Sequence, residues 1–138
     1  DIINLVSHMI VKHSSIDFDY MNVNTESGKK PHAHLVLNID GELKEAKSDG
    51  DGAVDAAFNA IEKIVQSKSK LLLYSVNNIT SGTDAQGEVT VRISKNSTVY
   101  NGHGADTDIV KASVLALINA LNKLKENPES NSLKKSGI

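Results

Sequence analysis

The chain has 138 residues, a formal net charge of −2, no cysteine and only 4% aromatic residues. Its length allows one domain with a modest aliphatic core and excludes a catalytic barrel of about 250 residues. The lack of cysteine excludes a disulfide framework and thiolate chemistry. There is no block of lysine and arginine, and no apolar run near the ~20 residues of a membrane span. We therefore expect neither nucleic acid nor a membrane as a partner, and a cytoplasmic location.

Residues 1–15 carry apolar side chains at helical spacing, which predicts the end of an upstream helical element in a larger protein. An ordinary N-terminal helix is the alternative. The first unit, 16–66, is predicted to contain three strands and a helix, over 16–24, 32–39, 42–47 and 53–66. Asp40-Gly41 predicts a two-residue hairpin, because both turn positions need positive φ. Asp51 is the predicted N-cap of the helix.

A second unit, 69–125, repeats this plan. Its strands and helix are expected over 70–79, 87–93, 97–101 and 107–125. Gly102-His103-Gly104 is interpreted as the turn before the helix, which Asp106 or Thr107 would cap. This helix is apolar nearly all round, so we expect a second side of it to be covered by the other unit or by another subunit. Residues 126–138 have no periodicity and are predicted to be a disordered tail.

The two units also share identical residues at a spacing of 54 positions. Five identities occur in the 20 aligned positions, where about one is expected by chance: Tyr20/Tyr74, Asn24/Asn78, Ser27/Ser81, Gly28/Gly82 and Ile39/Ile93. Together with the repeated strand pattern, they predict an internally duplicated α+β fold. Each unit would be strand-strand-strand-helix, with antiparallel sheets on which the helices pack.

Few residues suggest catalysis or metal binding. His32 and His34 would share a strand face, but two ligands do not make a metal site, and solvated histidines are the favoured interpretation. Two pairs of acids lie at the predicted helix starts, where capping explains them better than acid–base catalysis: Asp49/Asp51 and Asp106/Asp108. We therefore predict no catalytic residue and no metal ligand in this chain.

Two Gly-x-Gly segments, Gly50-Asp51-Gly52 and Gly102-His103-Gly104, are predicted to precede helix starts. Free backbone N–H groups and the helix dipole favour a carboxylate there, although a plain strand-to-helix turn is the alternative. On the expected buried face of the fifth strand, Ala85 and Gly87 leave space that larger neighbours could wall. A carboxylate site beside a small apolar pocket suits an aliphatic amino acid.

Three stretches occur in the order and spacing of a known family: GDGAVDAAFNAI, LLLYSVNNITSGTDAQGEVTVRI and GHGADTDIVKASVLALINALNKL. Over about residues 16–125 the chain resembles the C-terminal regulatory domain of 2-isopropylmalate synthases, which citramalate synthases share. The resemblance implies a homodimer that imposes end-product feedback inhibition on a separate catalytic barrel of the same polypeptide. That barrel would use a divalent metal to condense acetyl-CoA with 2-oxoisovalerate in leucine biosynthesis. The chain itself would hold no cofactor and would not be an enzyme.

The resemblance also implies an effector site for leucine. Its residues, carried over by position, are Gly50, Gly52, Ala53, Val54, Leu71, Tyr74, Asn78, Ala85 and Gly87. Ala105 and Asp106 would close the site from the neighbouring chain. Asn78 stands where several relatives are expected to have an apolar residue, while the GADTDI string favours leucine. The alternatives are an isoleucine-binding domain of a citramalate synthase and a dimerisation module without a working pocket.

Overall fold

The computed structural model describes residues 15–78 and 85–127, which form two sheets and two helices. The first unit consists of β1 (Ile16–Asn24), β2 (His32–Ile39), β3 (Glu42–Asp49) and α2 (Ala53–Val65). The second consists of β4 (Lys70–Asn78), β5 (Gly87–Lys95), β6 (Thr98–Asp106) and α3 (Ile109–Glu126). The strand orders are β1-β2-β3 and β4-β5-β6, with antiparallel neighbours, so the duplicated α+β fold is confirmed. Residues 1–14, 79–84 and 128–138, which include most of the predicted upstream element and tail, lie outside the described residues.

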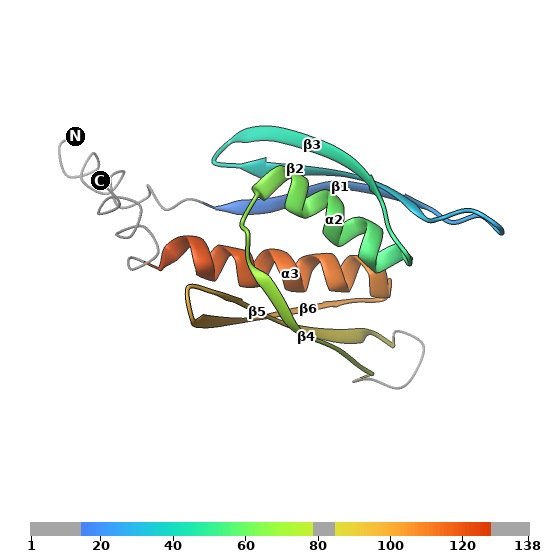
Figure 1. Cartoon of the computed structure of the whole chain (residues 1–138). Helices are drawn as coiled ribbons and strands as arrows, with labels where there is room; N and C mark the ends of the chain where they lie inside the picture. The colour runs from blue at the N-terminus through green and yellow to red at the C-terminus, as the bar shows by residue number, and fades with distance from the viewer. Residues whose placement is uncertain (1–14, 79–84, 128–138) are drawn as a thin grey trace, which may run out of the picture.

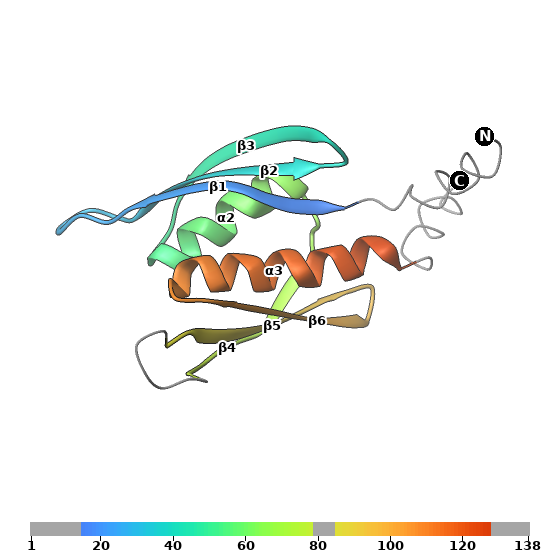
Figure 2. The same ribbon diagram turned by 180° about the vertical axis from the view of Figure 1, so that it is seen from behind.

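The two helices lie between the two sheets (Figure 1), and the reverse view shows the same order of layers (Figure 2). α2 packs on β2 and β3, whereas α3 packs on β5 and β6 and also contacts α2 and β1. The inward side chains of the two central strands are at most 1% exposed: Ala33, Leu35, Leu37, Val89, Val91 and Ile93. The second side of the apolar helix α3 is thus covered by the first unit of the same chain.

The two hairpins use the same backbone conformation with different residues. Asp40 and Gly41 have φ of 56° and 88°, as the sequence predicts for this turn. In the second hairpin Asn96 and Ser97 take the left-handed conformation, with φ of 53° and 67°. β6 begins directly after them and runs to Asp106, five residues beyond the predicted end of the strand.

This longer strand overturns the interpretation of Gly102-His103-Gly104 as a turn before a helix. Both glycines lie inside β6 and face α3, where an added Cβ would clash with the carbonyl oxygens of Ala116 and Ala112. Glycine is required because the helix backbone lies directly against the strand backbone. Gly50 has a similar role in the first unit, where a Cβ would clash with the backbone of α2 at Ala56.

The predicted helix caps are also wrong. The N-cap of α2 is Gly52, which makes no side-chain capping bond, while the backbone N–H of Asp51 donates to Asp55. The N-cap of α3 is Asp108, whose carboxylate accepts from the N–H of Val110 at 2.9 Å. Because β6 continues to residue 106, α3 starts two residues later than predicted. α3 then extends to Glu126, one residue into the segment predicted as tail.

The sequence identity between Tyr20 and Tyr74 does not reflect equivalent positions. β1 has a bulge between Phe18 and Tyr20, whereas β4 has one between Leu71 and Leu73. Phe18 pairs with Leu37 and Tyr74 with Val91, and these two partners are equivalent in the central strands. A shift of one residue moves a side chain to the opposite face of a sheet. Phe18 is therefore the structural counterpart of Tyr74, and Tyr20 lies on the outer face.

Candidate functional site

The face of β4 that points toward the helices is only partly covered. Leu71, Tyr74 and Val76 pair with buried residues of β5 and share their face of the sheet, yet they are 48%, 37% and 42% exposed. α3 covers β5 and β6, and no Cα atom of α2 lies within 8 Å of one in β4. We call this region, formed by Val54 and Phe58 of α2 with these three β4 residues, the open junction.

Tyr74 connects the open junction to both helices. Its ring meets that of Phe58 edge to face, with centroids 6.0 Å apart and an interplanar angle of 84°. Its hydroxyl lies 2.7 Å from Oγ of Ser113 on α3. Ser113 donates its one hydroxyl proton to the carbonyl oxygen of Ile109, also at 2.7 Å. Tyr74 therefore donates to Ser113, since a serine hydroxyl has a single proton.

The equivalent place in the other half, between α3 and β1, is filled. Ile16 is 1% exposed, and Asn122 of α3 binds both its backbone groups. The N–H of Ile16 donates to Asn122 Oδ1 at 2.7 Å, and Asn122 Nδ2 donates to the Ile16 carbonyl at 2.9 Å. Lys111 Nζ lies 5.3 Å from the ring centroid of Phe18. We call this region, formed by Ile16 and Phe18 with Lys111 and Asn122, the closed junction.

The start of α2 lies one helical turn from Phe58. Val54 is four residues before Phe58, so both side chains lie on the same side of the helix. Gly52 has an extended backbone with φ of −145°, and no atom lies within 4 Å of where a Cβ would be. The first turn of α2 thus has N–H groups without a side-chain cap, one helical turn before the residue that contacts Tyr74. Such a helix end favours a carboxylate.

The structure brings only part of the predicted site together. Val54, Leu71 and Tyr74 lie at the open junction, and Gly50, Gly52 and Ala53 lie at or just before the start of α2. Gly87 is buried at the start of β5, opposite Asn78 and Asp106 in the neighbouring strands. Ala85 is exposed just before β5.

The two residues predicted after the last strand lie within β6. Ala105 pairs with Glu88 on the outer face of the second sheet and so points away from the open junction of its own chain. The carboxylate of Asp106, at the end of β6, accepts from the N–H of Asp108 at 2.9 Å.

Two residues of the open junction, Phe58 and Val76, and the neighbouring Ser113 were not singled out as site residues from the sequence. Phe58 continues the apolar stripe of α2 four residues after Val54, and Val76 follows Tyr74 by the strand period of two. These two could have been found from periodicity. Ser113 has no such signal, because its contact depends on how α3 crosses the second sheet.

Other polar groups have local partners. His32 Nδ1 lies 2.6 Å from Asp49 Oδ1, and His34 Nε2 lies 2.6 Å from Glu45 Oε1, both on the outer face of the first sheet. The part of the chain that the structure describes contains no group of three or more His, Cys, Asp or Glu able to hold a metal ion. Within the same residues no helix is long and apolar enough to cross a membrane.

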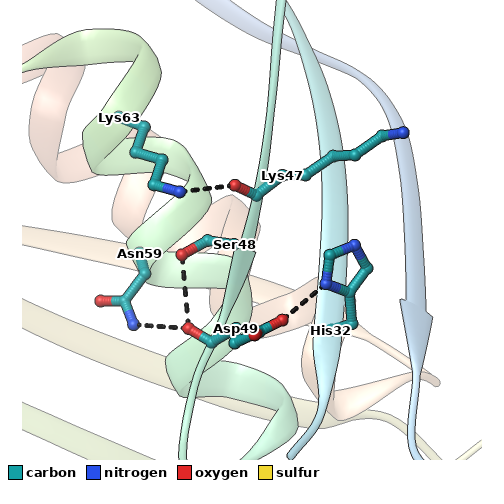
Figure 3. Close-up of polar contacts among 6 residues, drawn as sticks. All are labelled: His32, Lys47, Ser48, Asp49, Asn59 and Lys63. Carbon is teal, nitrogen blue, oxygen red and sulfur yellow. Dashed lines mark hydrogen bonds and ion pairs between the residues drawn. The ribbon is translucent and has the colours of Figure 1, made fainter.

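Side chains of α2 cover the outer edge of β3 (Figure 3). Lys63 Nζ donates to the Lys47 carbonyl at 2.7 Å, and Asn59 Nδ2 donates to the Asp49 carbonyl at 3.0 Å. A groove of about 440 Å³ lies here, lined by Ser48, Asn59, Glu62, Lys63, Gln66 and Lys68. It shares no residue with the predicted effector site, and two of its lining residues, Asn59 and Lys63, cover backbone carbonyls at the free edge of β3.

The fold and the open junction define a small duplicated α+β domain with one half tightly packed and an exposed apolar surface in the other half. The chain belongs to the LeuA allosteric (dimerisation) domain family, whose family model matches residues 1–125. The resemblance found in the sequence is thereby confirmed.

Curated relatives agree with this family. The chain is 58% identical over 109 residues to the 2-isopropylmalate synthase of Thiobacillus denitrificans, covering 79% of this chain and 21% of the relative. It is 57% identical over 105 residues to that of Nitrosomonas europaea, covering 76% and 21%. It is 49% identical over 118 residues to that of Nitrosococcus oceani, covering 86% and 23%. The chain spans only about a fifth of the length of these relatives.

Proposed function

We propose that the chain is the leucine-binding, feedback-inhibitory domain of a 2-isopropylmalate synthase. The observation that carries this proposal is the open junction, where apolar side chains of β4 lie exposed and α2, whose start is uncapped, brings Phe58 against Tyr74. An α-amino acid needs a partner for its carboxylate and an apolar surface for its side chain. The first turn of α2 would bind the carboxylate, and Tyr74 with one of its apolar neighbours on β4, Leu71 or Val76, would contact the isobutyl group.

Leucine is favoured over isoleucine because the relatives described above are named 2-isopropylmalate synthases. The parent protein would then be an acyltransferase that condenses acetyl-CoA with 2-oxoisovalerate, using a divalent metal in its catalytic barrel. An isoleucine-binding domain of a citramalate synthase is the second candidate. The chain alone is expected to show no turnover of acetyl-CoA with a 2-oxo acid.

The same domain would hold two subunits together. Its family description names dimerisation. β4 exposes a row of apolar residues, Leu71, Leu72, Leu73, Tyr74 and Val76, which is the kind of surface that a second subunit covers. We propose a two-fold homodimer in which this strand lies at the subunit interface and leucine binds between the strand and the partner subunit; sedimentation of the purified chain at micromolar concentration would test the dimer. A monomer under these conditions would contradict the homodimer.

Thermal melts with and without leucine test the effector site. A ligand that binds only the folded state at a hundredfold excess over Kd adds about 2.7 kcal/mol, which raises Tm by several degrees. Gly87→Val should abolish this rise, because it adds volume on the face of β5 that points to the helices. Thr90→Val, on the opposite face of the same strand, should keep it.

Isoleucine in the same experiment separates the two candidates. A larger rise in Tm with isoleucine would favour the citramalate synthase domain. No rise in Tm with either amino acid would favour the alternative that the chain is a dimerisation module without a working pocket. An equal rise in wild type and Gly87→Val would mean that the ligand binds away from β5.

A further inference from the structure

Ser113 is a buried polar residue beside the open junction. It lies on the second turn of α3 and its exposed fraction is 0%. Its hydroxyl accepts a hydrogen bond from the Tyr74 hydroxyl and donates one to the carbonyl oxygen of Ile109. Both bonds are 2.7 Å long. Ser113 therefore ties the Tyr74 hydroxyl to the backbone of α3 and fixes the direction in which the ring points.

The Tyr74 ring has room to lie elsewhere. Tyr74 is 37% exposed, and no Cα atom of α2 lies within 8 Å of a Cα atom of β4. On the α2 side its aromatic neighbour is Phe58. An untethered ring would be drawn over the exposed surfaces of Leu71 and Val76, because that burial removes apolar area from water. It would then cover the surface that a ligand's side chain must contact.

We propose that Ser113 is a positioning residue for the effector site: by holding the Tyr74 hydroxyl, it keeps the open junction accessible to the aliphatic side chain of the ligand. This inference rests on the leucine-binding function proposed above. A site that is already in its binding conformation loses less free energy to ordering when the ligand arrives.

The closed junction supports this assignment. There the counterpart of Tyr74 is Phe18, which has no hydroxyl, and Lys111 lies over its ring. A tethered tyrosine is thus found in the half that leaves apolar surface exposed, and an untethered phenylalanine in the half that is filled. This difference indicates that the bond between Tyr74 and Ser113 serves ligand binding, because the other half of the same fold forms without such a bond.

A double-mutant cycle on leucine affinity tests the proposal. We would measure Kd by calorimetry for the 138-residue wild type, Ser113→Ala, Tyr74→Phe and the double variant. Each single variant should weaken leucine binding by about threefold to tenfold, the range expected for one net hydrogen bond. The double variant should be no weaker than the worse single variant, because both changes remove the same tether.

Tyr100→Phe is the matched control. Tyr100 lies on the same face of the second sheet, and its hydroxyl accepts from Asn127 Nδ2 at 2.6 Å at the other end of α3. Its loss should lower stability without changing the Kd for leucine. A loss of affinity confined to Ser113 and Tyr74 would separate positioning from general stability.

The outcomes that overturn the proposal are distinct. An unchanged Kd in Ser113→Ala, or additive losses in the double variant, would show that Ser113 does not act through Tyr74, while leaving the leucine site intact. A wild type that binds neither leucine nor isoleucine would overturn the proposed function and the positioning role together.

Discussion

The open and closed junctions occupy equivalent places in the two halves of a duplicated fold, yet their packing differs. At the closed junction α3 approaches β1, and Asn122 binds both backbone groups of Ile16. At the open junction α2 stays away from β4, and Phe58 and Tyr74 make contact through their rings. α3 is capped by Asp108, whereas α2 starts at an uncapped Gly52.

The difference teaches how a duplicated fold can combine stability with binding. One copy of the junction buries its apolar surface and satisfies its backbone groups, which stabilises the association of the two units. The other copy leaves its apolar surface exposed and its helix start uncapped, which costs stability and leaves the surface that we propose for a ligand and a second subunit. Because both halves share one architecture, each feature of the open junction can be compared with the equivalent feature of the closed junction.

The largest expected loss of stability comes from separating α3 from the second sheet, because both junctions depend on the position of this helix. A Cβ at Gly102 would clash with α3 backbone atoms that cannot move away without lifting the helix. Gly102→Ala should therefore lower the free energy of unfolding by about 3 kcal/mol or more. Urea denaturation would measure it, with Gly52→Ala as control, since that glycine has open space around it. Equal stability of the two variants would contradict the close packing.

A smaller loss is expected at the closed junction. Asn122→Ala removes two hydrogen bonds and leaves the partly buried N–H and C=O of Ile16 without these partners, which should cost about 2 kcal/mol. Asn119→Ala, one turn earlier on α3, removes one exposed bond to the N–H of His103 and should cost less. Chemical denaturation of both variants tests this order. A reversed order would mean that the closed junction contributes little to stability.

At the open junction a comparable change should barely affect folding but should affect association. Val76 is 42% exposed, so Val76→Asp should lower stability by under about 1 kcal/mol while placing a charge on the surface proposed to meet a second subunit. We expect sedimentation to show a monomer. Val99→Asp, on the outer face of β6 and 49% exposed, should stay dimeric. If Val99→Asp alone dissociated, the subunit interface would lie on the outer face.

Most of the fold could be predicted because its signals are local. Alternating apolar residues gave β2 its observed bounds, and Asp40-Gly41 fixed its hairpin through the need for positive φ. The repeat indicated the duplication, even though Tyr20 and Tyr74 point to opposite faces of their sheets. The place of each bulge depends on strand pairing rather than on neighbouring residues, so a constant spacing could not reveal it.

The candidate site was predicted less well because it depends on contacts between distant elements. A Gly-x-Gly segment reads the same in a turn and in a strand that lies against a helix. Only the structure shows that Gly50 precedes α2, whereas Gly102 and Gly104 lie inside β6. The bond between Tyr74 and Ser113 joins residues 39 positions apart. That distance in sequence carries no periodic signal, so the residue that holds the tyrosine could not be predicted.

The smallest effect on stability should come from making the start of α2 resemble that of α3. Gly52→Asp supplies a carboxylate that can accept from the first-turn N–H groups, as Asp108 does in α3, and should raise stability by a few tenths of a kcal/mol. The added carboxylate would occupy the N–H groups proposed to bind the carboxylate of leucine, and would repel it. We therefore expect a slightly higher Tm without ligand and a clearly weaker response to leucine, measured in the same melts. Gly52→Ala, which adds a Cβ in open space without a cap, should keep the response. If Gly52→Asp bound leucine as tightly as wild type, the carboxylate of the ligand would have its partner elsewhere, and the uncapped helix start would not be what makes the open junction a binding site.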